Sequence, residues 1–326
     1  MRRSLVPILA AALATAVAAL SGAESLKILT YNLGLLRVVG TDYVPLVNAR
    51  AKVAPAEIAR IAREESIDII LLEEVWRASQ ERGIVAAVAP LGYAAVHPRV
   101  RSLVGLSSGL LLLVRSPLEV VEWSFTRFTH NAGIESVARK GVLEVTLRDP
   151  RAGSSRFVLI GTHTAALDTL GGEPIDKKQL AASIAQVDQI LAALERRSEG
   201  GAVPSLLLGD FNVGPGYADV VYRKIADAAG LREAGASASP ESAFATWDPA
   251  NPLVKHGRYP NEPAAKIDHV FLRDGRLQGW TVLSARLVMQ GAVRELGVVV
   301  LRGAAGVAPP LSDHYGFLVE VSLESR

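Results

Sequence analysis

The chain has 326 residues, of which 49% are hydrophobic and 21% charged, and this composition excludes a largely disordered or collagen-like protein. Its 35 basic and 33 acidic residues nearly balance, so the chain lacks the overall basic charge that favours binding to nucleic acid backbones. Cysteine is absent, which excludes disulfides, thiolate metal sites and cysteine nucleophiles.

The first 23 residues have the pattern of a secretory signal peptide. Two arginines precede an apolar run over residues 5–20, and small residues follow up to a cleavage position after Ala23. An uncleaved membrane anchor is the alternative, but the run is shorter than about 20 residues and consists largely of alanine. We therefore expect a secreted or periplasmic protein whose mature domain covers residues 24–326, with 33 basic and 33 acidic residues.

Strands and helices are mixed along the mature chain. Short apolar runs and alternating patterns predict strands over residues 25–32, 67–72, 109–114, 142–147, 156–161, 205–208, 266–272 and 317–323. Helical spacing of apolar residues predicts helices over residues 55–65, 77–89 and 177–197, and the first of these begins with a proline. Residues 35–48 are expected to form a loop. Without an internal repeat or a linker, this mixture predicts one layered α/β or α+β domain.

Polar or ionisable side chains stand at the ends of several apolar strands. Strand ends that share one rim of a sheet are common places for ligand sites. A single residue of this kind is explained as a turn former, but five residues of complementary chemistry indicate a site. The five are Asn32, Glu74, His163, Asp210 and His314.

Six short motifs that include these residues occur in a family-specific order. They are TYNLG, LEEVW, GTHTA, GDFNVGP, KIDHVF and SDHYG, and they span Thr30 to Gly316. In this set and order the chain resembles the endonuclease/exonuclease/phosphatase superfamily, which includes DNase-like nucleases, inositol polyphosphate phosphatases and neutral sphingomyelinases. The resemblance implies a four-layer α/β sandwich, in which two mixed β-sheets pack face to face with helices outside.

The resemblance also implies a divalent metal. Asn32 and Glu74 offer hard oxygen ligands that suit Mg²⁺. The family's metal-binding glutamate usually follows a glutamine, and here Glu73 occupies that preceding position. Because neighbouring residues in a strand point to opposite faces, only one of the two glutamates is expected to face the site, and we favour Glu74. Asp313 either supports His163 or contacts a second metal.

The two histidines are interpreted as an acid/base pair. Hydrolysis of a phosphodiester needs an activated water on one side and a stabilised or protonated leaving oxygen on the other. We expect His314 to activate the water, with Asp268 as its orienting carboxylate, and His163 to serve the departing side. Asp210 is expected to hold the water or the metal shell, and Asn212 to donate to a phosphate oxygen.

Three further segments resemble neutral and bacterial sphingomyelinases within this superfamily. They are ARKG at residues 138–141, THTA at residues 162–165 and TWDPAN at residues 246–251. The resemblance implies hydrolysis of sphingomyelin to ceramide and phosphocholine. Trp247 either contacts the choline group through its aromatic face or packs its own loop.

Other functions remain open at this point. A secreted DNase-like nuclease or another phosphoesterase is the alternative, although the neutral mature charge disfavours nucleic acid as a partner. A catalytically dead binding module is disfavoured because every matched site residue is present. Secreted sphingomyelinases often dock on membranes through a hairpin with exposed aromatic residues. Here the apolar residues 296–301 lack an aromatic pair and are expected to form a buried strand rather than a membrane-docking element.

Overall fold

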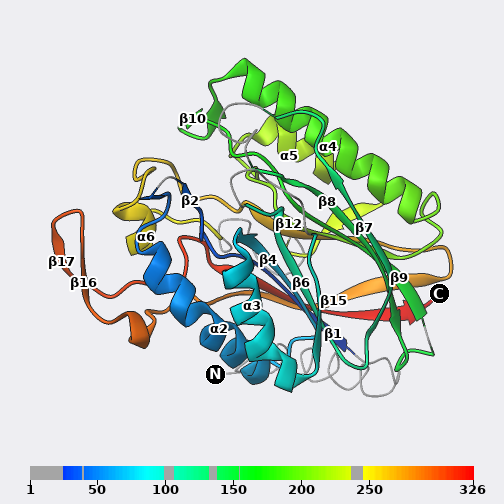
Figure 1. Ribbon diagram of the computed structural model, residues 1–326. Helices are drawn as coiled ribbons and strands as arrows, with labels where there is room; N and C mark the ends of the chain where they lie inside the picture. Colours follow the sequence, from blue (N-terminus) through cyan, green and yellow to red (C-terminus); the bar gives the residue numbers. More distant parts are fainter. Residues whose placement is uncertain (1–24, 39, 99–105, 132–137, 154, 236–244) are drawn as a thin grey trace, which may run out of the picture.

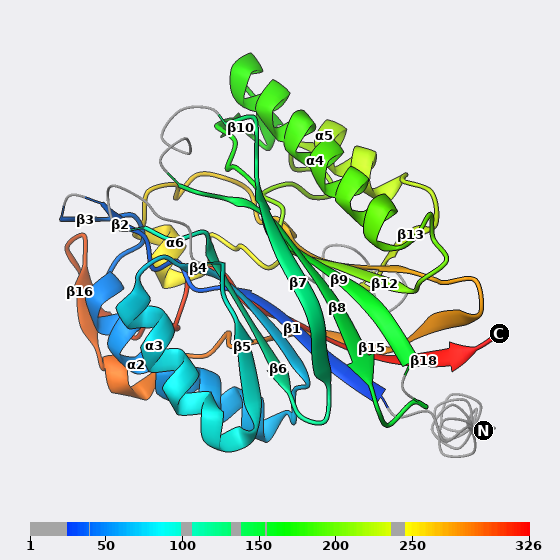
Figure 2. The same cartoon turned by 45° about the vertical axis from the view of Figure 1, so that its right-hand side comes forward.

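The computed structural model describes residues 25–38, 40–98, 106–131, 138–153, 155–235 and 245–326. Two six-stranded sheets pack face to face, and helices cover their outer surfaces (Figures 1 and 2). The predicted four-layer sandwich of two mixed sheets is therefore confirmed. The predicted signal peptide lies outside the described residues. Within the described ranges, no helix is both long and apolar enough to cross a membrane.

The first sheet has the strand order β15–β18–β1–β4–β6–β5. Strand β1 runs parallel to β4 on one side and antiparallel to β18 on the other. The outer face of this sheet is covered by α2 (Val47–Glu64) and α3 (Ala78–Val88), as Figure 2 shows. The strands are β1 (Ser25–Asn32), β4 (Ile69–Val75), β5 (Tyr93–Val96), β6 (Gly109–Arg115), β15 (Gln278–Val288) and β18 (Gly316–Ser325).

The second sheet has the order β13–β14–β12–β9–β8–β7. Strand β12 lies between the parallel β9 and the antiparallel β14. Helices α4 (Lys177–Arg197) and α5 (Asp219–Ala226) cover its outer face (Figures 1 and 2). The strands are β7 (Glu119–Arg127), β8 (Gly141–Asp149), β9 (Ser155–His163), β12 (Ser205–Asp210), β13 (Leu231–Glu233) and β14 (Asp268–Arg273).

Both faces of the central strands are buried, which explains their uninterrupted apolar sequences. In β4, Ile69 and Leu71 point into the core between the two sheets, whereas Ile70 and Leu72 pack under α2 and α3. Successive side chains of a strand point to opposite faces, so a strand covered on both sides needs apolar residues at consecutive positions. A third cluster fills the space between the second sheet and α4 and α5.

Short elements connect the longer helices and strands. The helix α6 follows the TWDPAN segment, and three small hairpins join longer elements. Their bounds are α6 (Pro252–Lys255), η1 (Ala89–Leu91), η4 (Arg294–Leu296), β2 (Arg37–Val38), β3 (Thr41–Asp42), β10 (Thr169–Leu170), β11 (Glu173–Pro174), β16 (Val299–Leu301) and β17 (Ala304–Val307).

The predicted start of the first helix is wrong. Helix α2 begins at Val47, and Pro55 lies inside it rather than in its first turn. The ring of Pro55 faces α3 at Gly83, where a Cβ atom would lie 3.2 Å from the proline Cγ. The close contact between the two helices therefore accommodates a residue that ordinarily marks a helix start. The expected loop over residues 35–48 consequently contains the hairpin β2–β3 and the beginning of α2.

The expected burial of residues 296–301 is also wrong. These residues enter the hairpin β16–β17, which extends away from the sandwich (Figures 1 and 2). Val298 is 71% exposed and Val300 is 65% exposed. Leu301, on the other face of the strand, is buried in a small cluster with Val44 and Leu253. The strand has one buried apolar face and one exposed apolar face. A continuous apolar sequence does not distinguish this arrangement from a strand that is buried on both faces.

Candidate active site

The predicted site residues converge where the two sheets meet at one edge. In the second sheet, Asp210 at the end of β12 is flanked in register by His163 on β9 and Asp268 on β14. Across the sandwich, Asn32 at the end of β1 donates from Nδ2 to Oδ2 of Asp210 over 2.8 Å. This buried hydrogen bond joins the two sheets, so the strand ends named from the sequence form one site.

His314 and Asp268 form a buried hydrogen-bonded pair. Nδ1 of His314 donates to Oδ2 of Asp268 over 2.9 Å, while the Thr246 hydroxyl accepts from the Asp268 backbone N–H over 3.1 Å. Burial alone lowers the pKa of His314, but the adjacent Asp268 carboxylate outweighs burial, so this pKa lies well above the ordinary value. The arrangement leaves Nε2 of His314 directed toward Asp210, at 3.9 Å from its Oδ2.

Asp210 lies between the two histidines. Its Oδ2 is 3.5 Å from Nε2 of His163, and its Oδ1 accepts from the backbone N–H of Asn212 over 2.8 Å. Burial, with the Asp268 carboxylate close by, raises the pKa of Asp210 to about 7. A carboxyl group with this pKa exchanges protons near neutrality, which suits a position beside an acid/base histidine.

Lys140 is a site residue that the sequence interpretation missed. Its ammonium group lies 3.0 Å from Nε2 of His163 and donates to the Thr164 carbonyl over 2.9 Å. An ammonium group has no acceptor, so Nε2 of His163 accepts and the ring proton sits on Nδ1. Burial and the Lys140 charge lower the pKa of His163 well below its ordinary value. His163 is therefore a neutral imidazole, and Lys140 supplies the positive charge. In the sequence, Lys140 belongs to the ARKG segment, and this segment was the signal that could have identified it as a site residue.

Glu73 and Glu74 occupy different surroundings because β4 is irregular. Glu74 has a positive φ of 59°, and the pairing of β4 with β6 shifts register between Leu72 and Val75. Glu73 is fully buried and accepts from the Thr30 hydroxyl over 2.7 Å. Oε1 of Glu74 lies 3.4 Å from Nδ2 of Asn32, at the site. The favoured glutamate thus lies beside Asn32, although a bulge rather than simple alternation separates the two side chains.

Asp313 lies on the Glu74 side of the site. A Cβ atom at Gly34, which follows Asn32 closely, would lie 2.5 Å from Oδ1 of Asp313. Burial raises the pKa of Glu74, and the nearby Asp313 charge raises it further. The polar neighbours of His163 are Lys140 and Asp210. Of the two roles expected for Asp313, the geometry therefore favours metal binding over support of His163.

The residues present fit a divalent cation. The Asp313 charge makes ionisation of Glu74 less favourable, and a bound cation would offset this repulsion. Asn32 uses Oδ1 to accept from the Gly34 backbone N–H over 2.8 Å and keeps a second lone pair on that oxygen. Asp210, Asp268 and His314 form a second group with ligand atoms within 4.8 Å of one another, which could also hold a metal. In that group Nδ1 of His314 is already bonded to Asp268, so an acid/base role explains it equally well.

The two predicted substrate contacts differ in accessibility. Asn212 is partly exposed, and its Nδ2 donates to the Thr164 carbonyl over 3.0 Å, which leaves one N–H of that amide for a ligand. Trp247 is only 9% exposed and packs against Val254 and Ile267. Its backbone forms a bridge with His314. The geometry therefore favours packing for Trp247 rather than a face open to choline.

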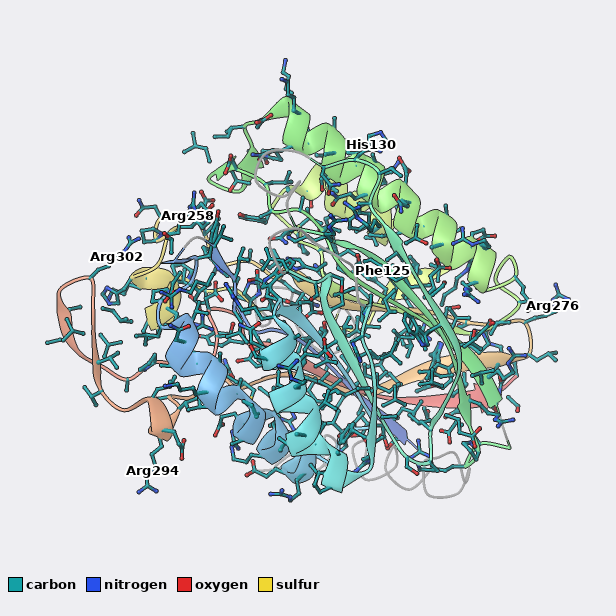
Figure 3. All side chains as sticks on the ribbon, viewed as in Figure 1. Phe125, His130, Arg258, Arg276, Arg294 and Arg302 are labelled. Carbon is teal, nitrogen blue, oxygen red and sulfur yellow. The ribbon has the colours of Figure 1, made fainter. Side chains whose placement is uncertain are left out.

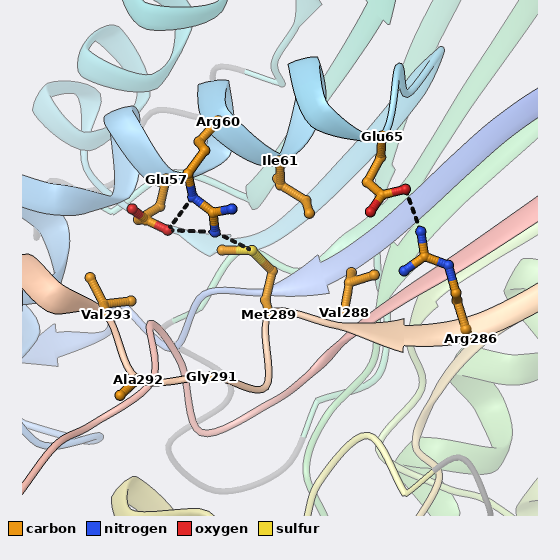
Figure 4. Close-up of a pocket in the computed structure, with 10 residues that line it drawn as sticks. All are labelled: Glu57, Arg60, Ile61, Glu65, Arg286, Val288, Met289, Gly291, Ala292 and Val293. Atoms are coloured by element: carbon orange, nitrogen blue, oxygen red, sulfur yellow. Dashed lines mark hydrogen bonds and ion pairs between the residues drawn. The ribbon is translucent and has the colours of Figure 1, made fainter.

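A separate pocket of about 260 Å³ lies between α2 and the end of β15 (Figure 4). Its charged side chains are already paired, since Arg60 bonds Glu57 over 2.8 Å and Arg286 bonds Glu65. The lining comes from α2, the following Glu65 and residues 286–293, and it includes no residue of the candidate site. We therefore assign the chemistry to the strand ends rather than to this pocket.

The family assignment follows from this fold and site. Residues 29–314 match the family described as "Endonuclease/Exonuclease/phosphatase family". The chain belongs to this family, as its motifs predict, and is accordingly a hydrolase that acts on phosphoesters. No curated protein matches the chain in sequence.

Several solved structures share the fold at low identity. Sphingomyelinase C from Streptomyces griseocarneus has a TM-score of 0.69 at 22% identity, covering 91% of this chain and 99% of that one. TDP2 from D. rerio, solved with a single-stranded DNA product, has a TM-score of 0.64 at 15% identity, covering 91% and 99%. A mannosyl-6-phosphatase of Bacteroides thetaiotaomicron has a TM-score of 0.65 at 17% identity, covering 91% and 99%. These neighbours act on different phosphoesters, so they support the fold and leave the substrate open.

Proposed function

We propose that the chain is a Mg²⁺-dependent phosphodiesterase that hydrolyses sphingomyelin to ceramide and phosphocholine. The observation that carries the proposal is the buried arrangement of His314, Asp210 and His163. One imidazole is held by a carboxylate and the other by an ammonium group, and Asp210 separates them. In-line hydrolysis of a phosphodiester uses a base that activates the attacking water and a positively charged group that stabilises the leaving oxygen, and this arrangement offers both.

The proposed reaction uses both sides of the site. Water attacks the phosphorus, and its proton passes to Nε2 of neutral His314 while Asp268 stabilises the imidazolium. The bond between phosphorus and the ceramide oxygen breaks, and that oxygen takes a proton from the Lys140 ammonium beside His163. Solvent then removes the proton from His314 and restores the one on Lys140. Asn212 donates to a non-bridging phosphate oxygen.

Mg²⁺ would be held by Asn32 and Glu74, with Asp313 as a further ligand candidate. When bound, the cation neutralises charge that develops on the phosphate oxygens. Removal of Mg²⁺ with EDTA is expected to abolish turnover, and Glu74→Ala is expected to weaken apparent Mg²⁺ affinity greatly. Full turnover in excess EDTA would refute this part of the proposal.

A phospholipid substrate at a membrane surface is supported by the ARKG, THTA and TWDPAN segments and by the hairpin β16–β17. Val298 and Val300 present an exposed apolar face. Arg294 and Arg302, both exposed, lie at the same edge of the molecule (Figure 3). An exposed apolar face with basic side chains nearby suits contact with a lipid surface.

A substrate panel with the purified protein and Mg²⁺ tests the proposed specificity. The panel contains sphingomyelin, lysophospholipids, DNA, RNA, inositol phosphates and a sugar phosphate. We expect phosphocholine release from sphingomyelin and little release of acid-soluble nucleotides from DNA. His314→Ala is the matched inactive control, which excludes a contaminating hydrolase. The opposite substrate preference would assign the protein to the nuclease branch and leave the catalytic assignment intact.

Export of the mature domain is a separate part of the proposal. It depends on the leader pattern of residues 1–23. Protein recovered from the periplasm or medium of a bacterial host is expected to begin at Glu24. A cytoplasmic product that retains the leader would contradict it.

A further inference from the structure

Helix α2 contributes a completely buried arginine that no step above uses. Arg50 has 0% relative exposure, although arginine is among the residues least often buried. Within the part of the chain that the structure describes, its guanidinium group donates only to backbone carbonyls. The acceptors are Pro45 at 2.9 Å, Leu33 at 2.6 Å, Gly34 at 2.5 Å and Leu311 at 3.1 Å.

Three of these carbonyls belong to the two loops that carry the candidate site. Leu33 and Gly34 directly follow Asn32, a proposed metal ligand. Leu311 precedes the segment that contains Asp313 and His314. Nη1 of Arg50 bonds to both loops at once, to Leu33 and to Leu311. The guanidinium group therefore links the loop after Asn32 to the loop that carries Asp313 and His314.

The positive charge of Arg50 interacts with acidic groups of the candidate site. Burial lowers the pKa of Arg50, and the strongest opposing influence is the carboxylate of Asp313, followed by Tyr31 and Glu74. Among the described residues, no carboxylate forms a hydrogen bond with Arg50. A buried cation held by neutral carbonyls is costly, and an apolar side chain would often serve stability equally well. The presence of a charged side chain at position 50 is therefore better explained by its attraction to the carboxylates of Asp313 and Glu74.

We propose that Arg50 is a positioning residue that holds the Asn32 and His314 loops at a fixed spacing and places a positive charge behind Glu74 and Asp313. The proposal rests on the assignment of the metal side made above. Arginine is required for this role because its planar fork directs several N–H groups at once. The single ammonium group of lysine supplies charge but cannot span the same carbonyls.

Arg50→Lys separates positioning from charge, and Arg60→Lys on the same helix is the matched control. Arg60 is partly exposed and pairs with Glu57 and Glu64, away from the site. Mg²⁺ binding is measured by calorimetry without substrate, thermal unfolding by circular dichroism, and turnover with a soluble chromogenic phosphodiester. For Arg50→Lys we expect about tenfold weaker Mg²⁺ binding and about tenfold lower kcat, with KM nearly unchanged, as for other outer-shell groups. Arg60→Lys should match the wild type in all three.

A purely structural arginine would give a different result. In that case Arg50→Lys would lower the unfolding temperature while the folded protein kept wild-type Mg²⁺ affinity and kcat, and the proposal would be overturned. If the wild type turned over substrate without binding Mg²⁺, the metal assignment would fail, and the comparison of kcat values would still decide the clamping role.

A measurement on the wild type covers the case in which Arg50→Lys does not fold. The Nε–H of Arg50 is buried and bonded to Pro45, so its resonance should exchange slowly in a protein labelled with ¹⁵N-arginine. Saturating Mg²⁺ is expected to shift this resonance, because the loops it holds carry the ligands. A resonance that does not respond to Mg²⁺ would overturn the proposal.

Discussion

Asp268 and His314 come from separate segments, yet their side chains are bonded as one unit in the site. Removal of the base in His314→Ala is expected to lower kcat by about 10²- to 10⁴-fold. Asp268→Asn should also lower kcat, since an amide can favour the wrong imidazole tautomer. The double variant should lose little more than His314→Ala alone, because residues that act as a unit are not additive. Independent, multiplicative losses at saturating Mg²⁺ would contradict the pairing, with circular dichroism as the folding control.

The pH dependence gives a second test of the same pair. A base must be deprotonated to accept a proton, so activity should fall as the pH drops through the His314 pKa. The Asp268 carboxylate holds this pKa well above its ordinary value. In Asp268→Asn the acid limb of the kcat/KM profile should therefore move to lower pH. An unchanged limb would mean that another group titrates there.

Glu73 provides a residue-scale prediction about stability. Burial, together with the Asp268 charge, raises the pKa of Glu73 well above the ordinary glutamate value of about 4.3. The folded state therefore retains a proton that the unfolded state releases, and stability falls as pH rises through this window. Glu73→Gln is isosteric and does not titrate. Its unfolding free energy relative to the wild type should increase with pH, by at most about 1.4 kcal/mol per pH unit. A constant difference between pH 4 and 9 would show that Glu73 is ionised in the fold.

At the scale of elements, the sequence predicted the central strands and their polar ends well. Those strands are buried on both faces, and their apolar runs end where Asn32, His163 and Asp210 begin the site. Of the strands of the two main sheets, β5, β7, β13 and β15 were not predicted. The sequence of β7 mixes charged and apolar residues that are mostly exposed or partly exposed. It therefore lacks the regular alternation of apolar and polar residues that predicts a strand.

The rest of the site depends on contacts between distant segments, which periodicity does not record. The bulge at Glu74 arises from pairing between β4 and β6. Lys140 reaches His163 only because β8 pairs with β9, and Arg50 reaches the site from the covering helix. The family resemblance supplied the other catalytic residues, whereas the role of Lys140, the bulge at Glu74 and the contacts of Arg50 became evident only from the tertiary structure.

The TWDPAN segment can be tested as an element that supports the SDH loop. Oδ1 of Asn251 caps α6 by accepting from the Leu253 N–H, and Nδ2 donates to the Ser312 carbonyl, each over 2.9 Å. Asn251→Ala should lower the unfolding free energy by about 1–2 kcal/mol and also lower kcat. Asn251→Asp keeps the cap acceptor but has no N–H for Ser312. If the tether positions His314, both variants should lose kcat; wild-type kcat in Asn251→Asp would show that only the cap matters.

At the scale of the whole molecule, the site and the hairpin β16–β17 are built on neighbouring connections. The hairpin follows β15 and leads through residues 308–313 to His314. Its buried face contacts Val44 and Leu253, which lie in the segments before α2 and within α6. Contact of the hairpin with a surface would therefore hold the catalytic edge close to that surface, where a phospholipid head group would be presented.

Replacement of the two exposed valines tests this arrangement. Full burial of a valine side chain in a lipid surface contributes about 1.5 kcal/mol, so Val298→Ser with Val300→Ser should weaken vesicle binding by about tenfold or more. Turnover of a soluble phosphodiester should remain at the wild-type level, because neither side chain belongs to the site. Val121→Ser is the matched control, since Val121 is 48% exposed on β7 in the second sheet. Binding is measured by co-sedimentation with sphingomyelin vesicles. If the double variant sediments like the wild type, or if Val121→Ser loses as much binding, the hairpin is not the docking surface.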